Sequence, residues 1–288
     1  MERIIGGPVV EAVSQTGGFS PGTADRVRTA DGRRAFVKAV AASLNTDSVR
    51  MARRELRINA AMPAHAPVPR LLGGFEHGEW VVIVLEDIAG SHPRTPWVAA
   101  EIDATVTALG ELARALTPAP LSDLPTAADH LTADFACWAA LAADPPADLD
   151  AWAARNAGSL HAAAQRGLAV LRTGDTLVNM DVRADNILIR EDGRIFFVDW
   201  PWGATAPAWF DRLALAINVI VHGGDARRIT AGIDPAVVRD IITGFTGYFH
   251  YQSRQPPPPG LPTVRAFQRF QGDALLPWVQ RAFSERTP

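Results

Sequence analysis

Cysteine is nearly absent from this 288-residue sequence, in which Cys137 is the only one. A single cysteine excludes an internal disulfide bond, and it argues against a zinc site, which usually takes several cysteine and histidine ligands. We expect Cys137 to be a small buried apolar residue. At 48% hydrophobic residues the chain can bury a substantial core, as one large domain or as two lobes of unequal size.

Long apolar runs and strong net charge are also missing. The longest apolar stretch, Leu213 to Val221, contains Asn218 and is far shorter than the ~18 residues that a membrane helix requires. The first residues, MERIIGGPVV, lack the layout of a signal peptide. The net charge of -3 provides no basic field to attract nucleic acid or an anionic membrane. We therefore expect a cytoplasmic protein, monomeric or weakly dimeric, with neither of those partners.

Lysine is equally rare, since Lys38 is the only lysine among 28 basic residues. A GC-rich genome that replaces lysine with arginine wherever possible would leave such a bias, and Lys38 could have escaped by chance. Arginine replaces lysine only where a solvated charge suffices, whereas a compact ammonium fits places that a planar guanidinium cannot. The surroundings of Lys38 must decide between these explanations.

The segment around Lys38 has the pattern of three antiparallel strands. The expected ranges are Val9 to Ser14, Thr23 to Thr29 and Arg34 to Val40. An Asp31-Gly32 turn joins the last two strands and places Lys38 on the third. The loop after the first strand is rich in small residues: Gly17, Gly18, Ser20 and Gly22. Its backbone N–H groups could approach phosphate oxygens, although a plain turn is the alternative, and no Gly-Lys-Ser/Thr follows as in a P-loop.

A helix is expected next, capped by Asn45, Thr46 or Asp47 and closed by Pro63. Glu55 falls in its apolar stripe, so it needs a cation, and Lys38 on the adjoining strand could supply one. The alternative is a partly exposed Glu55 paired with Arg54 or Arg57.

Two further strands, about Leu71 to Phe75 and Trp80 to Leu85, complete a five-stranded sheet with one helix. The segment Glu86 to Gly90 then precedes a Pro-bearing polar loop, and we place a boundary there. This predicts an N-terminal lobe over residues 1–88 and a C-terminal lobe over residues 89–288. The C-terminal lobe should be mainly helical, with the following helices: Trp97 to Leu116, Asp129 to Leu141, Leu149 to Val170, Ala208 to Val221, Pro235 to Tyr248 and Thr263 to Phe283.

The stretch NMDVRADNILIREDGRIFFVDW, residues 179–200, contains two apolar strand segments around a turn. A two-residue turn at Asp192-Gly193 would place Asn186 opposite Asp199, with Cβ atoms about 4.5 to 5.5 Å apart. Their oxygens could then share Mg²⁺, which binds through one or two side chains plus substrate phosphates. Asp181, five residues before Asn186, would lie nearby with a free carboxylate and be available as a base.

Asp-x4-Asn followed by a hairpin and a second Asp resembles the catalytic segment of protein kinases. It is more similar to that of the aminoglycoside phosphotransferase and choline kinase superfamily, in which Asp-Trp often replaces Asp-Phe-Gly. The pair here is Asp199-Trp200. The resemblance covers nearly the whole chain: the Gly-rich hairpin, Lys38, Glu55, the segment 86–90, the catalytic segment and the helical remainder, in the required order.

The resemblance implies an α+β, two-lobed protein-kinase-like fold and an ATP- or GTP-dependent kinase that phosphorylates a hydroxyl of a small molecule, such as an antibiotic, sugar or amino alcohol. Lys38, held by Glu55, would neutralise the α/β-phosphates, and Asn186 and Asp199 would hold Mg²⁺. Asp181 would accept the proton of the attacking hydroxyl. The backbone from Glu86 to Ile88 would meet the purine, and Gly18 and Ser20 would lie over the phosphates.

The sequence departs from the family pattern in two places. Asn179 stands where the family usually has the His that braces the catalytic loop, although Asn also offers a donor and an acceptor. A catalytically silent nucleotide-binding protein is therefore the alternative. Trp200-Pro201 replaces Phe-Gly, which disfavours a regulated protein kinase.

The acceptor site is not defined by the sequence. Trp200, Trp202 and Trp209 could stack on a sugar or a heteroaromatic acceptor, or pack beneath the C-terminal helices. Asp185 could bind a cationic acceptor or brace the loop through Arg183. Asp211 is expected to bond the loop from the start of a helix.

Overall fold

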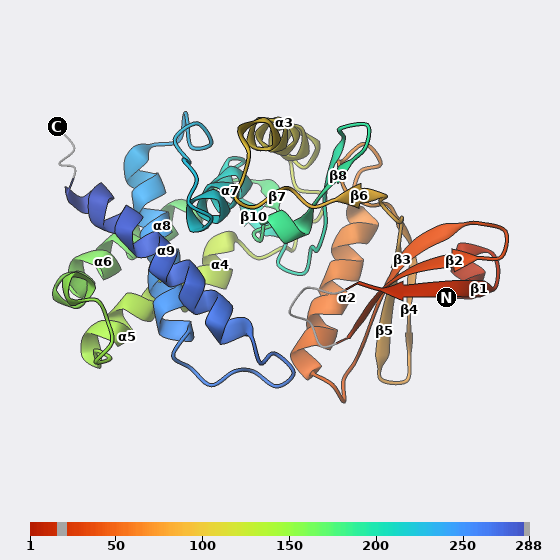
Figure 1. The fold of residues 1–288 in the computed structure, drawn as a ribbon, viewed down its shortest axis with the longest axis horizontal. Helices are drawn as coiled ribbons and strands as arrows, with labels where there is room; N and C mark the ends of the chain where they lie inside the picture. The colour runs from red at the N-terminus through yellow and green to blue at the C-terminus, as the bar shows by residue number, and fades with distance from the viewer. Residues whose placement is uncertain (16–21, 285–288) are drawn as a thin grey trace.

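A computed structural model describes residues 1–15 and 22–284 of the chain. Figure 1 shows an antiparallel sheet with the N-terminus on one side of the molecule, and a larger, mainly helical part on the other. The predicted α+β class with a small N-terminal sheet and a helical C-terminal part is confirmed.

The N-terminal sheet has five antiparallel strands in the order β1-β2-β3-β5-β4. Their bounds are β1 Val9–Ser14, β2 Thr23–Thr29, β3 Arg34–Ala41, β4 Leu71–His77 and β5 Trp80–Leu85. Apolar side chains alternate along β3 and fill β5, so one face packs into a small core that includes Val27, Val37 and Val84. This register places Lys38 opposite Ile83, in the middle of the sheet.

Helix α2 (Thr46–Ala61) packs against the sheet on the side that faces the helical part (Figure 1). Asn45 is its N-cap, because Asn45 Oδ1 accepts a hydrogen bond from the Ser48 N–H at 3.0 Å. Glu55 and Ile58 lie on its buried face, as the apolar stripe predicts. A one-turn helix, α1 (Glu2–Ile5), precedes the sheet and was not anticipated.

The remainder of the described chain is built from helices and two small sheets. The longer helices are α3 Ala99–Ala115, α6 Ala151–Val170, α7 Phe210–Val221, α8 Pro235–Gln252 and α9 Val264–Ser284. The small sheets contain β7 Thr176–Val178 with β10 Ala204–Ala206, and β6 Gly90–Ser91 with β8 Ile187–Arg190 and β9 Ile195–Phe197. No helix of the described residues combines the length and apolarity needed to cross a membrane.

The single helix expected over Asp129 to Leu141 is wrong. The segment forms α4 (Ala127–Leu131), a 3₁₀ turn η1 (Asp134–Ala136) and α5 (Cys137–Ala143). The break allows two fully buried rings, Phe135 and Trp138, to pack against glycines of α8. Local periodicity favoured one helix, and the packing of large aromatic rings against α8 overrides it.

The lobe boundary after residue 88 remains a proposal. Strand β5 ends at Leu85, and Gly90 of β6 already pairs with Arg190 of β8 in the C-terminal part. The few residues between them form the link, and we use the name hinge segment for residues 86–90, which end at Gly90 of β6.

The glycines of α8 give a test of this packing. A Cβ built on Gly247 would lie 2.5 Å from the buried Trp138 indole, whereas a Cβ on Gly158 of α6 meets nothing within 4 Å. Gly247→Ala should therefore destabilise the protein by about 1–2 kcal/mol through overpacking, despite the better helix propensity of alanine. Gly158→Ala, the matched control, should stabilise it by about 0.5–1 kcal/mol. Urea unfolding measures both, and stabilisation by Gly247→Ala would contradict the packing.

Candidate active site

A cleft with a volume of about 400 Å³ lies between the N-terminal sheet, α2 and the segment 185–201. Six of the residues predicted for the site line it: Lys38, Glu55, Glu86, Ile88, Asn186 and Asp199. Gly22 also lines it, and a Cβ on Gly22 would lie 2.6 Å from the Ala39 carbonyl oxygen, so this position requires glycine. Gly18 and Ser20 lie outside the described residues.

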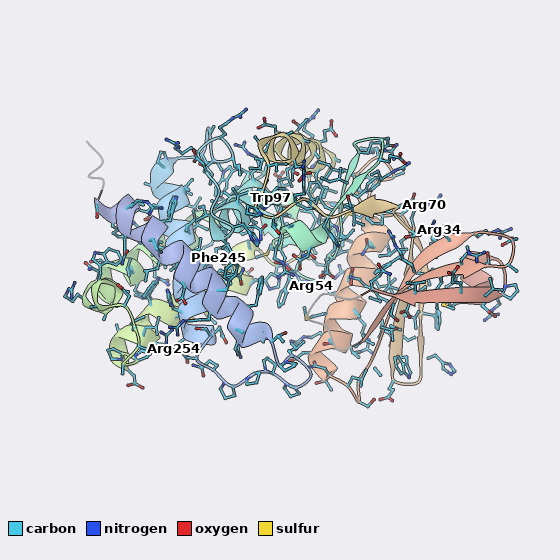
Figure 2. All side chains as sticks on the ribbon, in the orientation of Figure 1. Arg34, Arg54, Arg70, Trp97, Phe245 and Arg254 are labelled. Carbon is cyan, nitrogen blue, oxygen red and sulfur yellow. The ribbon has the colours of Figure 1, made fainter. Side chains whose placement is uncertain are left out.

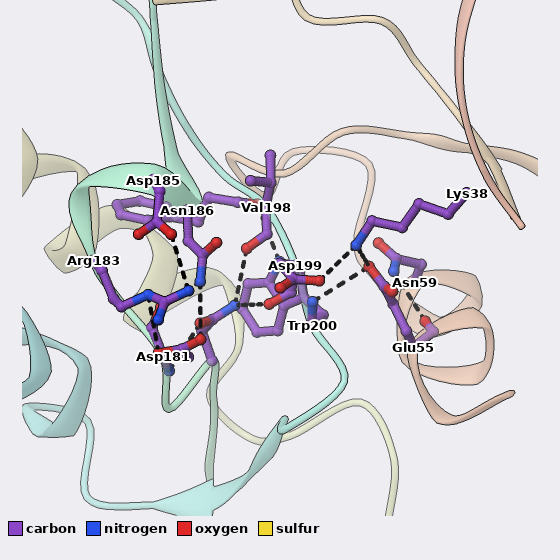
Figure 3. Close-up of polar contacts among 12 residues, drawn as sticks. Lys38, Glu55, Asn59, Asp181, Arg183, Asp185, Asn186, Val198, Asp199 and Trp200 are labelled. Carbon is purple, nitrogen blue, oxygen red and sulfur yellow. Dashed lines mark hydrogen bonds and ion pairs between the residues drawn. The ribbon is translucent and has the colours of Figure 1, made fainter. Parts of the chain in front are cut away.

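Lys38 joins the two sides of the cleft. Its Nζ donates to Glu55 Oε1 at 2.8 Å and to Asp199 Oδ1 at 2.5 Å (Figure 3). Glu55 is only 4% exposed, and its Oε1 also accepts from the Trp200 N–H at 3.4 Å. The partner expected for Glu55 is therefore Lys38, and the alternative pairing with Arg54 or Arg57 is wrong.

Burial and charge act in opposite directions on these three groups. Burial alone would lower the pKa of Lys38, but the carboxylates of Asp199 and Glu55 raise it above the usual lysine value. Burial raises the pKa of Glu55 against the opposing effect of Lys38. For Asp199 the Lys38 charge outweighs burial and lowers the pKa. The ammonium of Lys38 thus stays charged.

Asp181 lies beside Asn186 in the loop before β8. Asn186 Nδ2 donates to the Asp181 carbonyl oxygen at 2.8 Å and to Asp181 Oδ2 at 3.1 Å (Figure 3). Burial raises the pKa of Asp181 to about 7, although the nearby Arg183 charge opposes this. A carboxylate with a pKa in this range is suited to accept a proton near neutral pH.

Arg183 separates two carboxylates of this loop. Its Nε lies 3.4 Å from Asp181 Oδ1, and its Nη2 lies 3.0 Å from Asp185 Oδ2. The Arg183 guanidinium also sits over the Phe267 ring of α9, 5.4 Å from the ring centroid. Asp185 therefore braces the loop through Arg183, which was one of its two expected roles.

Asn179 holds the loop before β8 against the segment that carries Asp199. Its Nδ2 donates to the Asp199 carbonyl oxygen at 2.9 Å, and its Oδ1 accepts from the Asp181 N–H at 3.0 Å. Asp211, in the first turn of α7, accepts from the Asn179 and Met180 N–H groups at 2.8 and 3.0 Å. Met180 and Asp199 have φ angles of 72° and 64°. Such positive φ angles are rare in non-glycine residues, so these contacts hold a strained backbone at the site.

The predicted hairpin register is wrong by one residue. Ile187 pairs with Phe197 and Ile189 with Ile195, so Asn186 falls opposite Val198, whose N–H donates to the Asn186 carbonyl oxygen at 3.0 Å. The turn contains three residues, with Gly193 at φ 81°, rather than the two assumed. Asn186 and Asp199 both line the cleft, and Asp199, two residues after the end of β9, has a left-handed backbone conformation.

The oxygen atoms of the cleft fit Mg²⁺. No group of three or more His, Cys, Asp or Glu side chains gathers into a metal cage within residues 1–15 and 22–284. Magnesium does not need one, because it retains waters and takes the remaining ligands from phosphates. Asp199 uses Oδ1 for Lys38, and Asn186 uses Nδ2 for Asp181, so each side chain retains an oxygen atom suited to a hard cation.

Two of the three tryptophans considered for the acceptor pack in or against the core. Trp200 is 1% exposed, and its Nε1 donates to the Phe197 carbonyl oxygen at 3.0 Å, so it belongs to the core. Trp209 packs against the same core. Trp202 is 43% exposed, and its ring meets the edge of the His130 ring at a centroid distance of 6.0 Å.

Arg54 was missed as a site residue. Figure 2 shows it between α2 and the helical part of the molecule. Arg54 Nη2 donates to the Gly203 carbonyl oxygen and contacts His130 Nε2, both at 2.6 Å. It therefore ties the helix that carries Glu55 to the segment after Asp199. The sequence holds no signal for these two contacts, because Arg54 is 76 residues from His130 and 149 residues from Gly203.

A model of the phosphotransferase enzyme family (APH) matches residues 17–257 of the chain. No curated protein matches the sequence of the chain. The family match confirms the resemblance inferred from the residues.

Solved structures of similar fold cover nearly the whole chain. A thermostable mutant of aminoglycoside phosphotransferase APH(4)-Ia is 14% identical with a TM-score of 0.67, covering 100% of both chains. The amicoumacin kinase hAmiN, solved with AMP-PNP, Ca²⁺ and Ami, is 12% identical, with a TM-score of 0.61 and coverage of 92% of this chain and 88% of that one. APH(2")-IIia, solved with GDP and kanamycin, is 12% identical, with a TM-score of 0.63 and coverage of 97% and 95%. At these identities the likeness shows the fold, and it confirms the predicted protein-kinase-like architecture.

The contact between Arg54 and His130 should make stability depend on pH. Burial and the Arg54 charge lower the pKa of His130 to about 4, so the folded protein keeps this ring neutral while the unfolded chain protonates it near its usual value of about 6.5. The resulting stabilisation is present above pH 6.5 and is lost as the pH falls towards 4. We expect a loss of roughly 2 kcal/mol, allowing for partial exposure.

The measurement is urea unfolding at pH 7 and pH 4.5 for the wild type and His130→Gln. Glutamine can accept from Arg54 without titrating, so the variant should lose less stability between the two pH values. Equal losses would contradict the assignment.

Proposed function

Since this chain belongs to the phosphotransferase enzyme family, we propose that it transfers the γ-phosphate of ATP or GTP to a hydroxyl group of a small molecule. The observation that carries the proposal is Lys38, whose ammonium bonds Glu55 and Asp199 in the cleft that Asn186 also lines. The names of structural neighbours support a small acceptor, because they describe aminoglycoside phosphotransferases and an amicoumacin kinase. Their bound nucleotides, AMP-PNP and GDP, support a nucleotide of either base.

The contacts of Lys38, Glu55, Asn186 and Asp199 support the roles that we propose for them. Lys38 would neutralise the α/β-phosphates while Glu55 keeps its side chain in position. Asn186 and Asp199 would hold Mg²⁺, which neutralises charge on the phosphate oxygens when bound. The backbone of Glu86 to Ile88 would meet the purine, and Gly18 and Ser20 would cover the phosphates.

Asp181 would take the proton of the attacking hydroxyl. Asn186 Nδ2 orients its Oδ2, and Arg183 lies beside its Oδ1. Its raised pKa, about 7, increases its strength as a base compared with an ordinary aspartate. Asn179 performs the bracing expected of the His it replaces, which favours an active enzyme over a silent nucleotide-binding protein.

The charges around Asp181 bear on the acceptor. Arg183 pairs with both Asp181 and Asp185, so one positive charge is shared by two carboxylates and about one negative charge remains at this position. Aminoglycosides carry several ammonium groups and call for several uncompensated carboxylates. We therefore expect an acceptor with few positive charges, such as a sugar, a nucleoside or a macrolide, in preference to a polycation.

A panel of acceptors tests the proposed function. The protein is incubated with Mg-ATP or Mg-GTP and aminoglycosides, macrolides, nucleoside antibiotics, hexoses or choline, and mass spectrometry detects the gain of one phosphate.

Asp181→Asn should reduce turnover by roughly 10² or more and leave nucleotide affinity nearly intact. Asp199→Ala should weaken Mg-dependent nucleotide binding as well. Equal loss of nucleotide affinity in the two variants would contradict the division of roles.

The lone lysine gives an independent prediction. Lys38→Arg keeps the charge, but the broader guanidinium must displace either the phosphates or Glu55, which is buried against it. We expect turnover to fall at least tenfold while the thermal melting temperature shows a folded protein. The control is Arg50→Lys on the exposed face of α2, which should be nearly silent. Full activity of Lys38→Arg would mean that the lysine is a compositional accident.

A further inference from the structure

Arg26 lies in the cleft beside the hinge segment. In the sheet register Arg26 of β2 pairs with Phe36 of β3, and Phe36 pairs with Leu85, the residue before the hinge segment. Phe36 and Lys38 are two residues apart on one strand and therefore point to the same face, and Arg26, Phe36 and Lys38 all line the cleft. If Lys38 meets the phosphates, Phe36 and Arg26 are the sheet residues at the purine end.

The Arg26 side chain reaches the backbone to which a purine would bind. Its Nη2 donates to the Ile88 carbonyl oxygen, and its Nε lies 2.9 Å from Asp87 Oδ1. The Asp87 side chain is only 1% exposed, and its Oδ2 also accepts from Arg34 Nε at 2.8 Å. Figure 2 labels Arg34, on the five-stranded sheet. Because Arg34 also compensates Asp87, Arg26 can turn its guanidinium towards a ligand without leaving a buried carboxylate unpaired.

The chemistry of Arg26 distinguishes the two purines. A guanidinium only donates hydrogen bonds, and its fork matches the two adjacent acceptors O6 and N7 of guanine. Adenine presents an amino group in place of O6, so a donor would face a donor. We infer that Arg26 makes the cleft selective for guanine nucleotides over adenine nucleotides.

This inference rests on the proposed function, because it assigns the base of the phosphate donor. The competing role for Arg26 is mechanical, since its contact with Ile88 also ties β2 to the hinge segment. Loss of such a mechanical contact would weaken the binding of both purine nucleotides equally. Loss of O6 and N7 recognition would weaken the binding of guanine nucleotides and leave that of adenine nucleotides unchanged or improved. Hypoxanthine tests which atoms of guanine are recognised, because it has O6 and N7 but lacks the amino group of guanine.

The experiment measures dissociation constants of Mg-GDP, Mg-IDP and Mg-ADP by calorimetry for the whole chain. The variants are Arg26→Ala and Arg26→Lys, which keeps the charge beside Asp87 but lacks the fork. The matched control is Arg28→Ala, two residues along β2, where the arginine pairs with Glu11 and is half exposed. Thermal melting confirms that each variant is folded.

We expect the wild type and Arg28→Ala to bind GDP and IDP about tenfold or more tightly than ADP. Arg26→Ala should lose this difference, by weaker binding of GDP and IDP, and Arg26→Lys, whose ammonium can still donate to O6 or N7, should keep only part of it. Equal affinities for all three nucleotides in the wild type, or equal weakening of all three in the variants, would overturn the inference and leave the proposed function standing. Failure of every nucleotide to bind would overturn both.

Discussion

The carboxylate of Asp211 supports the geometry of the whole site. It is 5% exposed and accepts hydrogen bonds from the backbone N–H groups of Asn179 and Met180, so it fixes the start of the loop that carries Asp181 from the first turn of α7. Asn179 then bonds both Asp181 and the backbone of Asp199. Burial raises the pKa of Asp211 to about 6, and the two hydrogen bonds act in the opposite direction. The proposed base and metal ligand thus depend on one buried group that contacts neither.

Local sequence signals were sufficient for much of the fold. The Asp31-Gly32 turn and alternating apolar residues predicted β2 and β3 closely enough to place Lys38 on its strand, and Asn45 was among the expected caps of α2. The pairing of Glu55 with Lys38 followed from a simple constraint, because a carboxylate in an apolar stripe needs a cation and the adjoining strand offered one. The turn, the strands and the helix cap are each determined by residues close together in the sequence. The Lys38–Glu55 pair follows from the energetic cost of an unpaired buried carboxylate.

Other features depend on geometry that a short pattern does not contain. The pairing of β8 with β9 shifts by one residue when the turn at Asp192-Gly193 contains three residues in place of two. Such a one-residue slip moves every side chain to the other face of the strand. Asp199 still lines the cleft, with a positive φ two residues after the end of β9. The contacts of Arg54 with Gly203 and of Arg26 with Ile88 join distant segments, and an arginine-rich sequence offers too many candidates to select either one.

The bonds of Lys38 leave groups free for the roles that we propose for Lys38 and Asp199. An ammonium has three donors, and Glu55 and Asp199 take two of them, so one remains for a phosphate oxygen. Asp199 uses only Oδ1 for Lys38, which leaves Oδ2 for a cation. The pKa of Asp199 is lowered, so this second oxygen stays ionised when a metal competes for it. Lysine and aspartate can therefore keep their mutual contact while each also meets the nucleotide complex, and neither must be released to open the site.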